Sequence, residues 1–195
     1  MKRALLCLIP LLLLSGCGEA AFSREVEATM LVQVLGVDWT PDGVVLTAAC
    51  DPQTGSGGSQ TRVLCARGET LEQAKTVLQA AGEERISLTH VAQLVLGEGT
   101  PVSDVLYAAL DDPALGQGAT VWLADAGTAR ELLRAVEGGA KRLTSIELNS
   151  GAQPVPVLKA LMRLEERGWA ELPALRVQEE TLNLAGTIRV EGGGG

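Results

Sequence analysis

The sequence holds few of the residue types on which catalytic and metal sites usually depend. Its 195 residues include one histidine, His90, four cysteines, three tryptophans, one tyrosine and one phenylalanine. With a single histidine, Ser-His-Asp or Cys-His catalysis would depend on His90 alone. Cys50 and Cys65, the two cysteines beyond the N-terminal region, are with that histidine too few and unsuitably spaced to ligate a structural zinc ion. The scarcity of aromatic residues also means that Leu, Val and Ala must build the core.

Positive charge is scarce as well. The chain has 16 Lys and Arg residues against 24 Asp and Glu residues, which gives a formal net charge of -8 at pH 7. Binding to nucleic acid relies on Lys and Arg displacing counterions from phosphates, so the composition disfavours a nucleic-acid partner. Anionic lipid headgroups would repel the same surface.

Long hydrophobic runs are missing except at the start of the chain. There Lys2 and Arg3 precede an apolar run from Ala4 to Leu14. A helix needs about 20 apolar residues to cross the hydrocarbon core of a bilayer, so this run is too short for a membrane span. A basic start, a short apolar run and small residues are typical of an export signal, which we predict over residues 1–16.

The end of this run, Leu14-Ser15-Gly16-Cys17, resembles the lipobox of bacterial lipoproteins. The resemblance implies that the Cys17 thiol receives a diacylglyceryl group and that cleavage before it makes Cys17 the first residue. Two acyl chains hold a protein stably on a membrane, where one does not. We therefore expect Cys17 to be a lipid anchor on the outer face of a membrane. The alternative is an ordinary cleaved signal followed by an incidental cysteine.

The rest of the chain can form one domain or two small ones and predicts an α+β fold. We expect a mixed, largely antiparallel sheet with helices packed on it. Two β-branched runs flank Thr40-Pro41-Asp42-Gly43, a strong hairpin signal. Further strands are expected over residues 61–67, 91–96, 119–125 and 180–190, and the segment 51–60 is expected to be a loop.

Helix signals alternate with the later strands. Thr70 and Gln73, like Thr128 and Glu131, have the spacing of a capping box. Helices are therefore expected from residue 70 to about 81, from Thr100-Pro101 to Asp112-Pro113, from Thr128 to about Val136, and over 154–167. The apolar residues of the last helix are Val157, Leu158, Leu161 and Leu164. The stretch 139–153 remains ambiguous.

Candidate chemical sites are few. His90 lies at the mouth of the buried strand 91–96, where we expect a hydrogen-bonded structural role rather than a catalytic base. Gly97-Glu98-Gly99 fails as a phosphate-binding loop because it lacks a third glycine and carries a negative charge. Asp111-Asp112 and Glu83-Glu84 are expected to be solvated charges at helix ends. We predict no enzyme and no catalytic, cofactor-binding or metal-binding residue.

Cys50 and Cys65 lie at the ends of two strands expected to be adjacent. Outside the cytoplasm they could form a disulfide. Two separate buried thiols are the favoured alternative.

Several motifs follow one another behind the lipobox. They are REVEATMLVQVLGVDWTPDG, GETLEQAKTVLQ, RISLTHVAQLVLGEG and LDDPALGQGATVWLADAGTARELLRA. Their order over about residues 24–136 resembles the N-terminal region of the Ger(x)C family, the lipoprotein C subunit of bacterial spore germinant receptors. The similarity continues more weakly through VLKALMRLEERGWAELPAL and LNLAGTIRV. His90 falls on a family position to which the resemblance assigns no chemistry.

The resemblance implies a membrane-anchored, non-enzymatic subunit of a nutrient germinant receptor. Such a subunit would be tethered by Cys17 to the extracytoplasmic face of the spore inner membrane and would assemble with the integral membrane A and B subunits. Residues 17–190 would form the N-terminal domain of the family, followed by a flexible glycine tail over 191–195 and without the usual C-terminal domain. One alternative is an unrelated extracytoplasmic lipoprotein that binds a small ligand in a deep pocket with convergent polar groups. The other is a hydrolase that uses His90, which requires a nucleophile within hydrogen-bond reach of that histidine.

Overall fold

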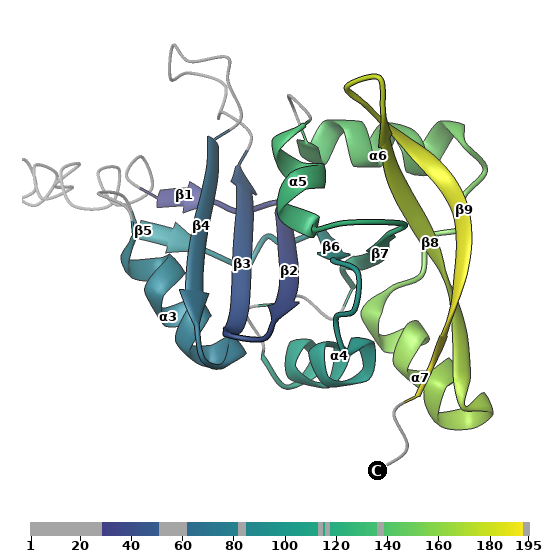
Figure 1. The fold of residues 1–195 in the computed structure, drawn as a ribbon, viewed down its shortest axis with the longest axis horizontal. Helices are drawn as coiled ribbons and strands as arrows, with labels where there is room; N and C mark the ends of the chain where they lie inside the picture. Colours follow the sequence, from purple (N-terminus) through teal and green to yellow (C-terminus); the bar gives the residue numbers. More distant parts are fainter. Residues whose placement is uncertain are drawn as a thin grey trace, which may run out of the picture.

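The computed structural model describes residues 29–50, 62–81, 85–112, 115, 118–135 and 139–192. Within them a seven-stranded sheet runs in the order β4-β3-β2-β6-β7-β8-β9 (Figure 1). A second, two-stranded sheet pairs β1 with β5. The strands are β1 (Thr29–Leu31), β2 (Val34–Thr40), β3 (Gly43–Cys50), β4 (Arg62–Gly68), β5 (Arg85–Ser87), β6 (Gln93–Leu96), β7 (Thr120–Ala124), β8 (Trp169–Gln178) and β9 (Thr181–Glu191).

The sheet is mixed, and its antiparallel ladders are the long ones. The pairs β2–β3, β3–β4 and β8–β9 are antiparallel along nearly their whole strands. The parallel pairs β2–β6, β6–β7 and β7–β8 join at most four residues each. Together with the helices on the sheet, this confirms the predicted α+β class with a mixed, largely antiparallel sheet.

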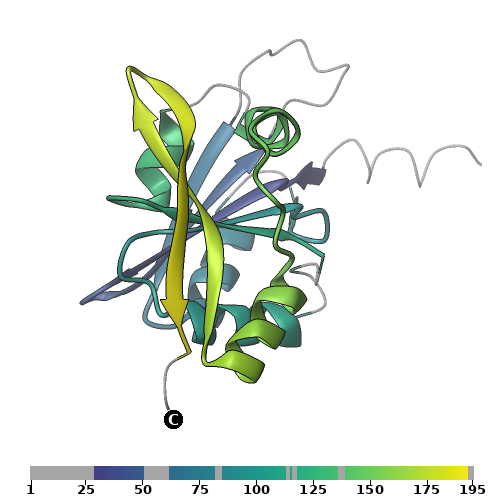
Figure 2. The same cartoon turned by 90° about the vertical axis from the view of Figure 1, so that its right-hand side faces the viewer.

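Helices cover both faces of the seven-stranded sheet (Figures 1 and 2). The larger core cluster joins one face to α3 (Leu71–Ala80), α4 (Val102–Asp111) and α7 (Val157–Arg167). The smaller cluster joins the other face to α5 (Ala129–Arg134) and α6 (Gly139–Asn149). Side chains alternate between the faces of a strand. In β2, Leu35 and Val37 therefore belong to the first cluster, whereas Val34 belongs to the second.

The hairpin between β2 and β3 forms at the predicted turn. Thr40 pairs with Gly43, which has a φ of 120°. A Cβ at Gly43 would also lie 2.3 Å from the carbonyl oxygen of Gly68. Both the left-handed backbone and the close contact therefore require glycine at this position.

The predicted capping boxes form to different extents. At α5, the Thr128 side chain accepts from the Glu131 N–H while the Glu131 side chain accepts from the Thr128 N–H. At α3, Thr70 accepts from the Gln73 N–H as predicted. The Gln73 side chain, however, accepts from the N–H of Glu69, one residue before the cap. Both helices thus begin where the sequence predicts.

Two expectations about helix ends are wrong. Thr100 does not cap α4, because its hydroxyl donates to the Val37 carbonyl instead and Pro101 occupies the cap position. The fourth predicted helix starts at Val157 rather than at residue 154, because Pro156 is extended and bridges Thr120 of β7. Leu158 does not face the core but is 45% exposed.

Three elements have no counterpart among the predictions. One is the short strand β5, which pairs with β1. The ambiguous stretch after residue 138 forms α6, and residues 169–178 form β8 between β7 and β9. The last strand, β9, extends to Glu191, one residue beyond the predicted end, and the Gly192 N–H donates to the Gly168 carbonyl. Cys17, the loop 51–60, Glu83-Glu84 and Val136 lie outside the described residues. No helix in the described part of the chain combines the length and apolar composition needed to cross a membrane.

Candidate functional site

The first candidate region is a buried junction between β2 and the start of α5. Asp38 is 4% exposed, and its two carboxylate oxygens accept from the N–H groups of Ala129 at 2.6 Å and Arg130 at 3.0 Å. The next N–H, that of Glu131, donates to the Thr128 hydroxyl. The first turn of a helix has N–H groups without intrahelical partners and attracts anions. Here a carboxylate from the chain itself occupies that position.

Two glycines allow the chain segments to approach one another at this junction. A Cβ at Gly97 would lie 2.0 Å from the Asp38 Oδ1 atom. A Cβ at Gly36 would lie 2.9 Å from Leu133 and 3.0 Å from Ala129, both on α5. No side chain fits at either position without moving its neighbours, so the junction, which we call the Asp38 junction, is fully packed.

Glu98 also contributes to this packing rather than to a phosphate site. Its side chain accepts from the Gly127 N–H at 3.0 Å, and its own N–H donates to the Gly127 carbonyl at 2.9 Å. Gly97-Glu98-Gly99 therefore holds the loop before α5.

The acidic groups of the junction have shifted proton affinities. Burial raises the pKa of Asp38 above its ordinary value, although the N–H donors of Ala129 and Arg130 oppose this shift. The hydrogen bonds from the N–H and hydroxyl of Thr128 lower the pKa of Glu131. Both carboxylates accept hydrogen bonds from backbone N–H groups at the start of α5, and we assign both a structural role.

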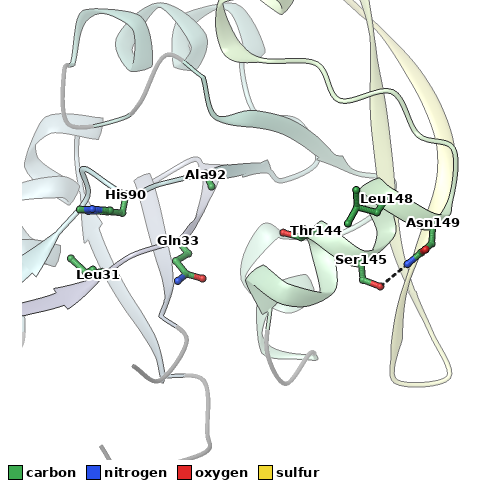
Figure 3. Close-up of a pocket in the computed structure, with 8 residues that line it drawn as sticks. All are labelled: Leu31, Gln33, His90, Ala92, Thr144, Ser145, Leu148 and Asn149. Carbon is green, nitrogen blue, oxygen red and sulfur yellow. Dashed lines mark hydrogen bonds between the residues drawn. The ribbon is translucent and has the colours of Figure 1, made fainter. Parts of the chain in front are cut away.

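The second candidate region is an open groove of about 540 Å³ between α6 and the segments that flank β6 (Figure 3). Three distant parts of the chain line this groove, which we call the His90 groove. The residues are Leu31, Gln33, His90, Ala92, Thr144, Ser145, Leu148 and Asn149. Figure 3 shows the first four on one side and the four from α6 on the other. Its volume lies in the range of small-molecule sites.

A hydrogen-bond network fixes α6 as one wall of the groove. Gln93 of β6 is 4% exposed and donates to Glu147 of α6 at 3.3 Å. Thr120 of β7 donates to the other Glu147 oxygen at 3.4 Å. The Trp122 indole N–H donates to Gln93 at 2.5 Å, which sets the orientation of the Gln93 amide. Leu143 and Ile146 of α6 add apolar contacts with the smaller core cluster.

The opposite wall is held by backbone bonds. The Gln33 carbonyl accepts from the N–H groups of Ala92 and Gln93, at 2.9 and 3.1 Å. The Gln33 N–H donates to the Ala49 carbonyl of β3. Both walls are therefore attached to the seven-stranded sheet.

His90 has the hydrogen bond that the sequence predicts, at an exposed position. Its Nδ1 atom lies 3.0 Å from the Thr89 hydroxyl, which lies 2.9 Å from the Ser87 hydroxyl. A Ser-His-Asp arrangement also needs a carboxylate that orients the imidazole. The described residues place no hydrogen-bonded carboxylate on this histidine. The Thr89–His90 pair thus has only part of the geometry that the hydrolase alternative requires.

Asp112, one of the acidic residues expected at helix ends, lies in a different environment from the one predicted. Asp112 was expected to be solvated, but its side chain is only 10% exposed and lies 2.5 Å from the Lys75 ammonium of α3. Burial would lower the pKa of Lys75, but its hydrogen bonds to Asp112 and Glu72 outweigh this effect and raise it. The ion pair joins α3 to the end of α4. Both charges are largely removed from water, so each needs the other as its partner.

The remaining candidate ligands do not come together. Cys50 and Cys65 form no disulfide, and Cys65 instead lies 3.6 Å from the Thr47 hydroxyl. Cys50 is buried as expected, whereas Cys65 is only half-buried. Within the described ranges no three His, Cys, Asp or Glu side chains lie close enough to hold a metal ion.

Residues 23–171 match the family model described as the spore germination protein N-terminal domain. The chain belongs to this family. The match covers well over half of the 195 residues and confirms the resemblance found in the sequence. No curated protein and no solved structure gives a significant match. Membership of the spore germination family indicates a germination-related role and membrane association, and this is not a known enzyme family.

The structure explains what the spore germination motifs do in this chain. Gly36-Val37-Asp38, Gly97-Glu98 and the Thr128–Glu131 segment, each inside a quoted motif, meet at the Asp38 junction. Sequence reasoning found the three segments but not the contact between them. Asp38 lies 91 residues before Ala129, so its role as a helix cap has no local signal. Gln93 and Glu147, which hold α6, were missed for the same reason.

Proposed function

We propose that this chain is a non-enzymatic lipoprotein subunit of a nutrient germinant receptor. A diacylglyceryl group on Cys17 anchors it to the extracytoplasmic face of the spore inner membrane. There it acts in germination by assembling with the integral membrane A and B subunits. The observation that carries the proposal is the family match over residues 23–171, directly behind the lipobox at 14–17.

The chemistry of the described residues supports a role in assembly rather than catalysis. The motif segments hold α5 against the sheet. Both carboxylate oxygens of Asp38 already accept hydrogen bonds from the backbone of that helix. A negatively charged domain gains little from anionic lipid, so a covalent lipid supplies the attachment. Its own helices and sheet supply a rigid body that neighbouring subunits can contact.

Membrane fractionation of spores tests the anchor. Cys17→Ala should move the protein from the membrane to the soluble fraction, because the thiol that receives the lipid is gone. Cys7→Ala is the matched control, since Cys7 lies in the same N-terminal segment but outside the lipobox. The Cys7 variant should remain in the membrane fraction. A Cys17 variant that stays bound would refute the anchor.

Crosslinking in intact spores tests the assembly. Mass spectrometry of the captured proteins should identify two multi-span membrane subunits with the wild-type chain. A strain that lacks this chain should fail to germinate on at least one nutrient, and normal germination on every nutrient would contradict the proposal. His90→Ala should preserve germination, whereas its loss with intact folding would favour the hydrolase alternative.

A further inference from the structure

We infer that the His90 groove binds an uncharged, polyhydroxylated small molecule. The inference goes beyond the proposed receptor role and does not depend on the lipid anchor. It starts from the composition of the groove. Although 21% of the chain consists of charged residues, none of the eight described lining residues is Asp, Glu, Lys or Arg.

The absence of charge among these lining residues selects against charged ligands. An ammonium group that enters the groove loses hydration and meets no Asp or Glu among the described lining residues, and a carboxylate or phosphate meets no Lys or Arg and could pair only with the His90 imidazole. Glu147, on the same helix, is held by Gln93 and Thr120 and is not part of the described lining. Its negative charge further disfavours an anion.

The polar side chains present suit hydroxyl groups. Gln33 and Asn149 each carry a donor and an acceptor, and the hydroxyls of Thr144 and Ser145 can act as either. The Asn149 amide already donates to Ser145 at 3.1 Å, which leaves the hydroxyl proton of Ser145 able to point into the groove. Hydroxyl groups also donate and accept, so they can pair with this set in several orientations.

The apolar lining residues suit the carbon framework of such a molecule. Leu31, Ala92 and Leu148 line the groove together with the polar side chains, and Leu148 is 78% exposed. The aliphatic face of a sugar ring can pack on these side chains. Because the described lining contains no Trp, Tyr or Phe and the groove is open, we expect weak binding.

The groove is formed before any ligand arrives. The Gln93–Glu147 and Thr120–Glu147 hydrogen bonds attach α6 to the sheet, and the Gln33 carbonyl holds the opposite segment. A preformed site spends little binding free energy on ordering its walls. Weak polar contacts can therefore give measurable affinity.

Ligand-observed NMR on the full chain in detergent micelles tests the inference. The probes are glucose, which is uncharged, alanine, which is zwitterionic, succinate, which is dianionic, and N-acetyl-trialanine amide, an uncharged peptide. Glucose should bind, and the other three should bind at least about fivefold more weakly. Absence of glucose binding, or equal binding of alanine or succinate, would overturn the inference. Preferred binding of the peptide would instead assign the groove to extended protein segments and would also overturn it.

Two variants locate the binding at the groove. Ser145→Ala should weaken glucose binding about fivefold, because one hydrogen bond contributes about 1 kcal/mol. Leu148→Lys removes an apolar contact and places a positive charge at the rim, so it should weaken glucose binding and strengthen succinate binding relative to the wild type. Thr76→Ala on α3 is the control, since its exposed hydroxyl bonds only within its own helix at the Glu72 carbonyl.

The outcomes separate this inference from the proposed function. Unchanged glucose binding in both groove variants, with cooperative unfolding retained, would place the sugar elsewhere and overturn the inference. If Ser145→Ala fails to fold, Leu148→Lys still decides, because Leu148 is exposed and its replacement leaves the core intact. The fate of the Cys17 variant in membrane fractionation does not affect either result.

Discussion

The Asp38 junction and the His90 groove lie at different parts of one sheet and have opposite characters. The junction is closed, charged at its centre and filled by backbone N–H groups and glycines. The groove is open, and its described lining combines polar and apolar side chains without an Asp, Glu, Lys or Arg. The strongest motifs in the sequence lead to the junction, where no space for a ligand remains.

The difference shows that a motif can mark a structural contact as readily as a binding site. Gly97 and Asp38 both belong to recognisable motifs, and a glycine at position 97 leaves the space that the Asp38 carboxylate occupies. The groove, by contrast, draws on residues with no motif spacing, from segments around 31, 90 and 145. Changes at the junction should therefore affect stability, and changes in the groove should affect binding.

The largest effect is expected for Gly97→Ala. The new methyl group would lie 2.0 Å from the Asp38 Oδ1 atom, so the carboxylate must leave the N-terminus of α5. We expect a loss of about 3 kcal/mol in the free energy of unfolding, measured by urea denaturation. Gly118→Ala is the control, because no atom lies within 4 Å of its added Cβ. Equal stability of the two variants would show that the junction is loosely packed.

A smaller loss is expected for Asp38→Ala. This change leaves the N–H groups of Ala129 and Arg130 without acceptors in a buried place and should cost about 2 kcal/mol. Asp42→Ala, on the turn of the same hairpin, removes an Asp side chain that is 77% exposed. It should change the stability by less than about 0.5 kcal/mol. A comparable loss in both variants would mean that Asp38 does not act through the helix.

The pH dependence of the junction should be weaker still. Burial raises the pKa of Asp38 in the folded state above 3.8, so the folded protein holds this proton more tightly than the unfolded chain. The stability that the site contributes therefore falls as the pH rises from 3.8 through the raised pKa, and then levels off. Denaturation over this range should show the stability of the wild type falling relative to Asp38→Asn, which does not titrate. The opposite slope would mean that the two N–H donors outweigh burial.

The smallest effect on stability is expected in the groove. His90→Ala removes an exposed ring that is hydrogen-bonded to its neighbour Thr89. The free energy of unfolding should change by less than about 0.5 kcal/mol in the same denaturation assay. A loss as large as that of Asp38→Ala would show that the groove is structural and would remove the contrast with the junction.

Local features of the fold were predictable from the sequence, because their signals lie within a few residues. The Thr40–Gly43 turn and the Thr128–Glu131 capping box depend on neighbours in the chain. The alternation of strands with apolar helix faces was sufficient for the fold class. The error at Thr100 has a tertiary cause, since its hydroxyl bonds to Val37 on another strand.

The strand β8 shows why part of the sheet was not predictable. Pro173 lies inside it and lacks an N–H group, which normally argues against an interior strand. The pairing of β8 with β7 begins only at Ala174, so on that side the proline does not interrupt the ladder. This register depends on the whole sheet. The groove was likewise not predictable, because it forms only when α6 reaches the segments around β6.

The position of Trp122 gives the molecule an internal optical probe. Its indole is completely buried, and its N–H is bonded to Gln93, which also bonds Glu147 on the groove wall. Of the other two tryptophans, Trp39 is 41% exposed, and the Arg189 guanidinium lies over the ring of Trp169. Any displacement of α6 will alter the surroundings of one fluorophore through a single intervening amide. Tryptophan emission can therefore report a displacement of α6 without an attached dye.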